Sequence, residues 1–266
     1  MKKINHKIAF TLAEVLITLG IIGVVAAMTL PTVVANYQKK AYVTQLKRSI
    51  SLWEQVFKKM MADDGVDSLK DTTVFNKING TLCDNNSSSS VCDDFYKELG
   101  KYVKIINIAQ AKEVNYTYKW LKKGSSPIWP DRATSNVIFL SDNTLIQAYK
   151  FRKAPESPQP IPCDVVNQNG GQMCEVMGNL SIDINGLKGP NVNGRDVFTF
   201  NISGNGLLIP YYSSSQSIYV YGDTRNNWIA QPRGCGHKGV ADAETVSQYG
   251  SGCAARVIDN GWVMDY

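Results

Sequence analysis

The first quarter of the chain carries two successive hydrophobic patterns. Residues 10–30 are almost wholly apolar, and Glu14 is their only charge. Apolar residues then recur at heptad-like spacing, with lysine and arginine side chains between them, at Leu46, Ile50, Trp53, Phe57 and Met60. The pattern predicts one helix from Phe10 to about Met61, roughly 80 Å long and bent at Pro31. A helix that is apolar all round and then amphipathic is expected to pack against copies of itself.

After Met61 the pattern changes to short β-type runs separated by turn residues. Asp63-Asp64-Gly65 is typical of a helix end, and residues 93–103 predict a short helix. Residues 137–149 and 197–210 each predict a hairpin, around Ser141-Asp142-Asn143 and Gly204-Asn205-Gly206. The pattern therefore indicates an α+β protein with a small antiparallel sheet.

Two later segments have distinct compositions. Residues 154–162 contain four prolines and predict a loop or linker. In residues 256–266 a turn at Asn260-Gly261 precedes alternating apolar residues, which predict a final strand or a docked tail.

The apolar stretch from Phe10 to Leu30 is long enough, at about 31 Å, to cross a bilayer. Lysines precede it, so its start is expected in the cytoplasm and the rest of the chain outside. One interpretation is a secretory signal peptide cut at Val25-Ala26-Ala27, with a soluble mature protein starting near Met28. Against this, the helical pattern continues, and Glu14 would cost roughly 2.5–3.5 kcal/mol within hydrocarbon.

Ala9-Phe10-Thr11-Leu12-Ala13-Glu14, followed by the apolar stretch and Pro31, resembles the class III signal of type IV pilins and type II secretion pseudopilins. The resemblance implies cleavage between Ala9 and Phe10 by a prepilin peptidase, which then N-methylates Phe10. It also implies that the Glu14 carboxylate pairs with the N-terminal ammonium of a neighbouring subunit. The chain departs from the family at Ala9, where glycine is usual.

The resemblance also implies an architecture and a cellular setting. Residues 1–9 are a leader, residues 10–61 a pilin helix with a transmembrane part at 10–30, and residues 62–266 a periplasmic or extracellular head. The implied fold is type IV pilin-like, a long helix packed on an antiparallel sheet. The subunit would wait in the inner membrane and then join a filament in the periplasm or on the cell surface.

The function implied is that of a structural subunit, for protein secretion by a type II secretion-like system. Its partners would be copies of itself, other pilins, the prepilin peptidase, and an inner-membrane assembly platform with its ATPase. A minor tip pilin that binds a surface, DNA or a secreted substrate is the alternative.

Six cysteines lie as neighbouring pairs, none with zinc-site spacing: Cys83 and Cys92, Cys163 and Cys174, Cys235 and Cys253. Behind an export-type N-terminus they predict three disulfides, and we expect sequential pairing among the possible connectivities. The formal charge of +5 includes three lysines before Ala9. The remainder is nearly neutral, which argues against nucleic-acid binding.

One polar loop, residues 181–196, offers oxygen ligands at Asp183, Asn185, Asn191, Asn193 and Asp196. Calcium prefers such ligands, and the resemblance adds it because major pseudopilins bind calcium near this part of the head. The EF-hand pattern fails, because Lys188 and Gly194 occupy its glycine and glutamate positions. The alternative is a structural turn in which Asp and Asn bond their own backbone.

No catalytic signature is present: the chain lacks GxSxG, Walker, HExxH and dinucleotide patterns. His237 is the one histidine beyond the leader, in a glycine-rich loop. We therefore expect no enzymatic activity and, apart from calcium, no cofactor.

Overall fold

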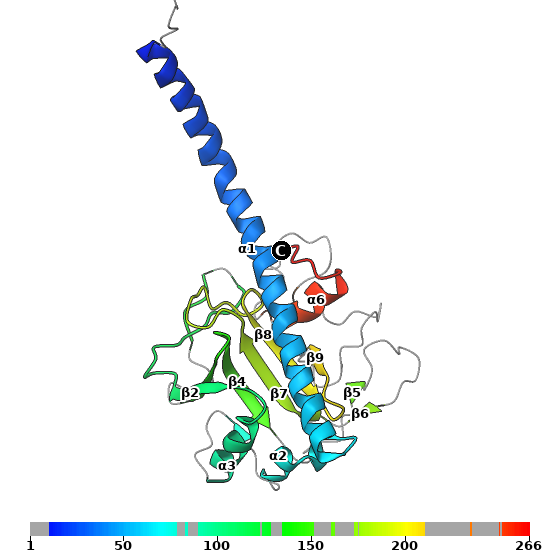
Figure 1. Ribbon diagram of the computed structural model, residues 1–266. Coiled ribbons are helices and arrows are strands. Elements are labelled where there is room, and N and C mark those ends of the chain that lie inside the picture. The colour runs from blue at the N-terminus through cyan, green and yellow to red at the C-terminus, as the bar shows by residue number, and fades with distance from the viewer. Residues whose placement is uncertain are drawn as a thin grey trace, which may run out of the picture. The chain divides into compact units, whose positions relative to one another are not determined.

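The computed structural model of the protein describes residues 11–78, 83–84, 90–122, 124–128, 135–151, 161–162, 173–174, 176–210, 235, 250 and 252–266. The chain divides into two compact units, residues 1–41 and 42–266. Helix α1, Leu12–Asp64, belongs to the first unit up to Ala41 and to the second from Tyr42 on (Figure 1).

The first unit, where the structure describes it, is helical from Leu12 to Ala41. The helix continues through Pro31. Its large apolar side chains are exposed on every side; Leu16, Ile22 and Val33, for example, are each about 60% exposed. In a soluble chain such a surface is unusual, because large exposed apolar patches mark interaction or membrane surfaces.

The second unit begins with the amphipathic part of α1. All five heptad-like residues, from Leu46 to Met60, are buried, and Trp53 and Phe57 are at most 1% exposed. They join one hydrophobic core with the sheet residues Phe198 and Phe200. The amphipathic part of α1 therefore packs on the antiparallel sheet of its own chain, as expected of a long helix packed on a sheet.

The end of α1 follows the turn signal in the sequence. The helix ends at Asp64, and Gly65 adopts a φ of +65°, which favours glycine. The helical region is thus slightly longer than the expected 10–61. The boundary between compact units lies earlier, after Ala41, because residues from Tyr42 on pack with the head.

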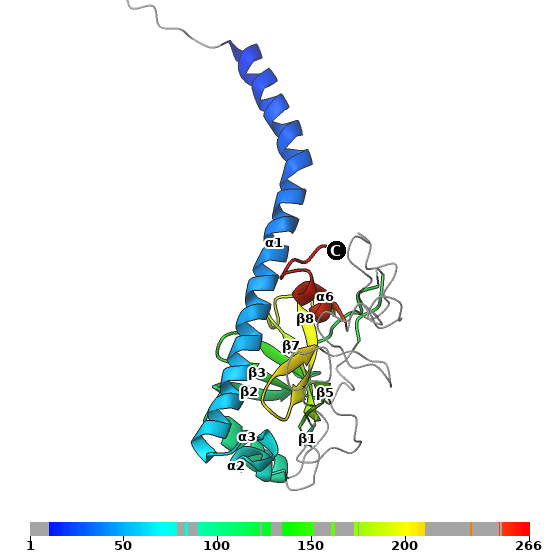
Figure 2. The same cartoon turned by 90° about the vertical axis from the view of Figure 1, so that its right-hand side faces the viewer.

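The second unit contains an antiparallel sheet in the order β2-β3-β4-β7-β8-β9, with β1 paired to β4. The strands are β1 (Cys83–Asp84), β2 (Ile105–Gln110), β3 (Asn136–Leu140), β4 (Leu145–Phe151), β7 (Val176–Asp183), β8 (Val197–Ser203) and β9 (Leu208–Pro210). Figure 2 shows the Tyr42–Asp64 part of α1 along one face of this sheet. The α+β class and the antiparallel sheet are confirmed.

Both expected hairpins form. The β3–β4 turn has Asn143 at a φ of +68°, and the β8–β9 turn has Gly206 at +82°. A Cβ at Gly206 would lie 3.1 Å from atoms of both Phe57 and Met61. Glycine is therefore needed there both for its backbone conformation and for the close approach of the hairpin to α1.

Short elements complete the second unit. They are η1 (Leu69–Asp71), α2 (Thr73–Asn76), α3 (Ser90–Leu99), α6 (Cys253–Asp259) and the two-stranded pair β5 (Ile161–Pro162) and β6 (Met173–Cys174). The helix expected at residues 93–103 forms as α3, which begins and ends a few residues earlier, at Ser90 and Leu99. Near the C-terminus the structure has the helix α6 and a docked tail rather than a final strand. Of the proline-rich segment 154–162, residues 154–160 lie outside the described residues.

Candidate functional site

The start of α1 holds a local hydrogen-bond arrangement around Glu14. The backbone N–H and the hydroxyl of Thr11 both donate to Glu14 Oε2, each at 2.8 Å, and the Glu14 N–H donates to the Thr11 hydroxyl at 3.3 Å. This is a capping box, in which a hydroxyl residue and a glutamate three positions later satisfy free N–H groups at a helix start. The Thr11-x-x-Glu14 spacing is a capping-box signal that can be read from the sequence.

Glu14 therefore stabilises the start of α1 within its own chain. Ala9 and Phe10, the residues at the expected cleavage, lie outside the described residues. The helix that follows is long and apolar enough to cross a membrane, by length and composition.

The polar loop between β7 and β8 is an acidic turn, defined here as residues 183–196. Asp183 accepts hydrogen bonds from the Asn185 N–H at 3.1 Å and from the Tyr116 hydroxyl at 2.8 Å. Asp196 accepts from the N–H groups of Asn191 and Val192 at 2.9 and 2.6 Å. All four carboxylate oxygens thus take a donor from the chain, as expected for a structural turn.

The two carboxyl groups of the acidic turn are fully buried and electrostatically coupled. Burial raises the pKa of Asp183 well above its usual range, and the nearby Asp196 charge raises it further. Burial also raises the pKa of Asp196, opposed by the hydrogen bonds from Val192 and Asn191. Two like charges in one buried turn favour uptake of a proton or of a cation.

The amide side chains of the acidic turn add possible ligands. The Oδ1 atoms of Asn185 and Asn191 are buried and have no hydrogen-bond partner among the described residues. Buried oxygens normally have partners, so these atoms need an explanation. Carboxylate and amide oxygens are the ligands that calcium prefers. The described part of the chain contains no group of three or more His, Cys, Asp or Glu side chains placed to hold a metal.

The acidic turn is anchored to the C-terminal tail. A Cβ at Gly194 would lie 2.6 Å from Cys253 Sγ, and the Tyr266 hydroxyl donates to the Gly194 carbonyl at 2.6 Å. Cys253 is bonded to Cys235. The turn, the disulfide and the last residue therefore form one packed unit.

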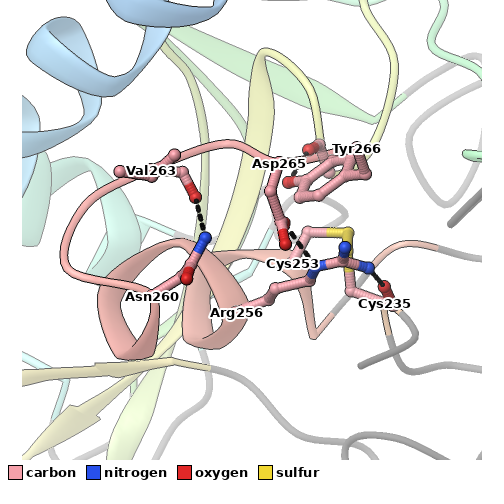
Figure 3. Close-up of polar contacts among 8 residues, drawn as sticks. Cys235, Cys253, Arg256, Asn260, Val263, Asp265 and Tyr266 are labelled. Atoms are coloured by element: carbon pink, nitrogen blue, oxygen red, sulfur yellow. Dashed lines mark hydrogen bonds and ion pairs between the residues drawn. A yellow bond between two sulfur atoms is a disulfide. The ribbon is translucent and has the colours of Figure 1, made fainter. Parts of the chain in front are cut away.

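Arg256 of α6 is at the centre of this unit and is fully buried (Figure 3). Its Nε donates to Asp265 Oδ1 and its Nη1 to the Cys235 carbonyl, both at 2.7 Å. Its guanidinium lies 4.9 Å from the centroid of the Tyr266 ring. A buried arginine with an anionic partner, a carbonyl and an aromatic ring is well satisfied. This arrangement holds the tail, and nothing in the local sequence pattern indicated it.

Two of the sequential cysteine pairs are disulfides in the structure, Cys83–Cys92 and Cys235–Cys253. Cys174 is in β6, while its expected partner Cys163 lies outside the described residues. His237 lies outside them as well.

Comparison with known proteins gives no relative. No protein-family model, no curated protein and no solved structure matches the chain.

Proposed function

We propose that the chain is a structural subunit of a type IV filament, a pilin or a pseudopilin of a type II secretion-like system. It is made as a prepilin, cut between Ala9 and Phe10, N-methylated at Phe10 and assembled through its N-terminal helix. The observation that carries the proposal is the exposed apolar surface of α1 from Leu12 to Val34, which has Glu14 as its only charge. Such a surface needs either lipid or other helices around it.

The mechanism is mechanical. The apolar part of α1 first holds the subunit in the inner membrane and then packs among the helices of neighbouring subunits. Glu14 meets the N-terminal ammonium of an adjacent subunit, because two unpaired charges in an apolar medium are each costly and pairing offsets that cost. The pairing favours one register between helices. The head, stabilised by disulfides, forms the outer surface.

Two substitutions of Glu14 separate its intrachain and intersubunit roles. Glu14→Gln keeps a side-chain oxygen for the Thr11 N–H, since glutamine also completes a capping box. It removes the charge that the ammonium needs. Glu14→Val removes both interactions.

We expect both variants to be processed and inserted, and both to be missing from sheared filaments measured by immunoblotting. Thr11→Ala, which disrupts the capping box and keeps the charge, is the control and should assemble. Normal assembly of Glu14→Gln would show that the charge pairing is not needed.

We also propose that the acidic turn binds one calcium ion. The residues that would hold it are Asp183, Asn185, Asn191, Asn193 and Asp196, and the unpartnered amide oxygens of Asn185 and Asn191 support this. A bound cation would offset the repulsion between the two buried carboxylates.

The test is calorimetry and thermal unfolding of the full chain in detergent, with Ca²⁺ and with Mg²⁺ as the control. At a concentration a hundredfold above its Kd, calcium should add about 2.7 kcal/mol to the free energy of unfolding. Absence of both heat and thermal shift would remove the site.

A further inference from the structure

The exposed surface of α1 changes from apolar to aromatic and basic at the end of the first unit. Val33 and Val34 are the last large aliphatic residues of the exposed stretch, at 61% and 49% exposure. Tyr37 follows at 73% exposure. Lys39, which is partly exposed, and Lys40, which is exposed, come next, and both still belong to the first unit. An aromatic residue and then cations directly after an apolar helix are typical of a membrane–water interface.

The spacing of these residues matches the headgroup layer of a bilayer, if the apolar part of α1 is within the hydrocarbon. In a helix Tyr37 lies roughly 4–5 Å beyond Val34, and the two lysines lie roughly 8 and 9 Å beyond it. The headgroup layer is about 5–8 Å thick on each side of the hydrocarbon. A lysine side chain is long enough to place its ammonium group back into this layer. The Tyr37 ring and both ammonium groups therefore reach the depth of the lipid phosphates.

The charge of α1 beyond the apolar stretch has one sign. From residue 15 to residue 53 the chain contains no aspartate or glutamate, and its four cationic side chains are Lys39, Lys40, Lys47 and Arg48. The helix thus carries no carboxylate near the first two lysines. Lysine and arginine are less common on the translocated side of a membrane helix than on the cytoplasmic side, so an adjacent pair there needs a partner. Phosphate groups at the same depth have the complementary charge.

We propose that Lys39 and Lys40 bind the phosphate groups of anionic lipids, of the phosphatidylglycerol type, in the leaflet where the apolar part of α1 ends. Tyr37 lies among the same headgroups. The contact holds the helix at one depth, since interfacial aromatic and cationic residues set the position of a membrane helix. The lipids are released when the subunit leaves the membrane for a filament, so this inference rests on the membrane stage of the proposed function.

The test measures the lipid selectivity of the full chain in vesicles of phosphatidylcholine and phosphatidylglycerol, with a spin-labelled form of each lipid as the probe. The parent chain should prefer phosphatidylglycerol. Replacing Lys39 and Lys40 together by glutamine should lower this preference at least about fivefold, the contribution of one lysine near an anionic surface. Replacing both by arginine keeps the charge and should keep the preference. The three lysines before Ala9 are the same in every variant and add equally to each.

A second lysine pair on the same helix provides the matched control. Lys58 and Lys59 are adjacent and exposed, and they follow the first pair by roughly 29 Å in a continuous helix. This is well beyond the screening length of about 8 Å at physiological salt. Replacing both by glutamine should leave the lipid preference unchanged. In 1 M salt, where the screening length is about 3 Å, the parent chain and the Lys39→Gln, Lys40→Gln chain should become alike.

Three results would overturn the proposal: an unchanged preference after Lys39→Gln with Lys40→Gln, an equal loss after Lys58→Gln with Lys59→Gln, or a difference that persists in 1 M salt. If the first double variant keeps the preference and is missing from filaments, the lysines contact protein and the lipid contact is wrong. Alkaline carbonate extraction of the same vesicles separates the two proposals. A parent chain released by carbonate contradicts the membrane stage itself, whereas an inserted chain without lipid preference contradicts only the lipid contact.

Discussion

Replacing Asp183 and Asp196 by asparagine, one at a time, tests the electrostatics of the acidic turn. The two carboxylates differ in their donors. Asp183 takes the Tyr116 hydroxyl as well as the backbone N–H of Asn185, whereas Asp196 takes the backbone N–H groups of Asn191 and Val192. An asparagine at 183 can keep the N–H bond and donate its amide N–H to the Tyr116 oxygen. An asparagine at 196 cannot satisfy both N–H groups, because its amide nitrogen is a donor.

The magnitudes follow from these contacts. Asp196→Asn leaves a buried N–H group facing another donor, which costs about 1–3 kcal/mol. Asp183→Asn leaves the Tyr116 O–H without its acceptor but removes the repulsion with Asp196, which offsets part of that cost, so its cost should be smaller. For a unit of this size the cost of Asp196→Asn corresponds to a Tm lower by about 2–12 °C than that of the parent chain, at about 2–4 °C per kcal/mol.

The pH dependence has a definite sign. The folded-state pKa of Asp183 is raised, so its contribution to stability is present at acidic pH and is lost as the pH rises through the folded pKa. The stability of Asp183→Asn relative to the parent chain should therefore improve from acidic to neutral pH. Tm measured by circular dichroism in detergent and EDTA, between about pH 4 and pH 8, gives this difference. The reasoning is refuted if the Tm difference between Asp183→Asn and the parent chain does not change with pH. It is also refuted if Asp196→Asn is more stable than Asp183→Asn.

Two further substitutions test the C-terminal unit. Arg256→Met should cost about 3 kcal/mol, the lower end for a broken buried ion pair because the Asp265 side chain keeps 21% exposure, and denaturant unfolding measures this loss. If Arg256→Met lowers the free energy of unfolding by less than Asp265→Asn does, Arg256 does not hold the tail as assigned. Gly194→Ala and Gly65→Ala form a matched pair, since both glycines have positive φ but only Gly194 lacks room for a Cβ. Gly65→Ala should cost about 1–2 kcal/mol and Gly194→Ala clearly more, with Tm as the readout; equal costs would count against the close contact with Cys253.

Local signals in the sequence predicted the parts of the fold that depend on neighbouring residues. Ser141-Asp142-Asn143 and Gly204-Asn205-Gly206 specify hairpins because their residues tolerate positive φ, and Gly65 ends α1 for the same reason. The apolar spacing of Leu46 to Met60 predicted a buried helix face correctly. The same spacing could not identify the covering partner, because a stripe packed on its own sheet and one packed on another copy look alike in sequence.

Polar contacts between residues far apart in the chain could not be predicted from the sequence. The Tyr116–Asp183 hydrogen bond joins residues 67 positions apart, and Arg256 meets the Cys235 carbonyl across a disulfide loop. No periodicity marks either contact. The alternating apolar residues of the tail predicted a final strand or a docked tail, and the structure has the docked tail, which follows helix α6.

The most direct test of the proposed function is the intact mass of the mature protein from membranes of cells that contain a prepilin peptidase. The account predicts a chain that begins at Phe10 and carries one added methyl group at its N-terminus. A chain that still begins at Met1, or one that begins near Met28, would contradict it.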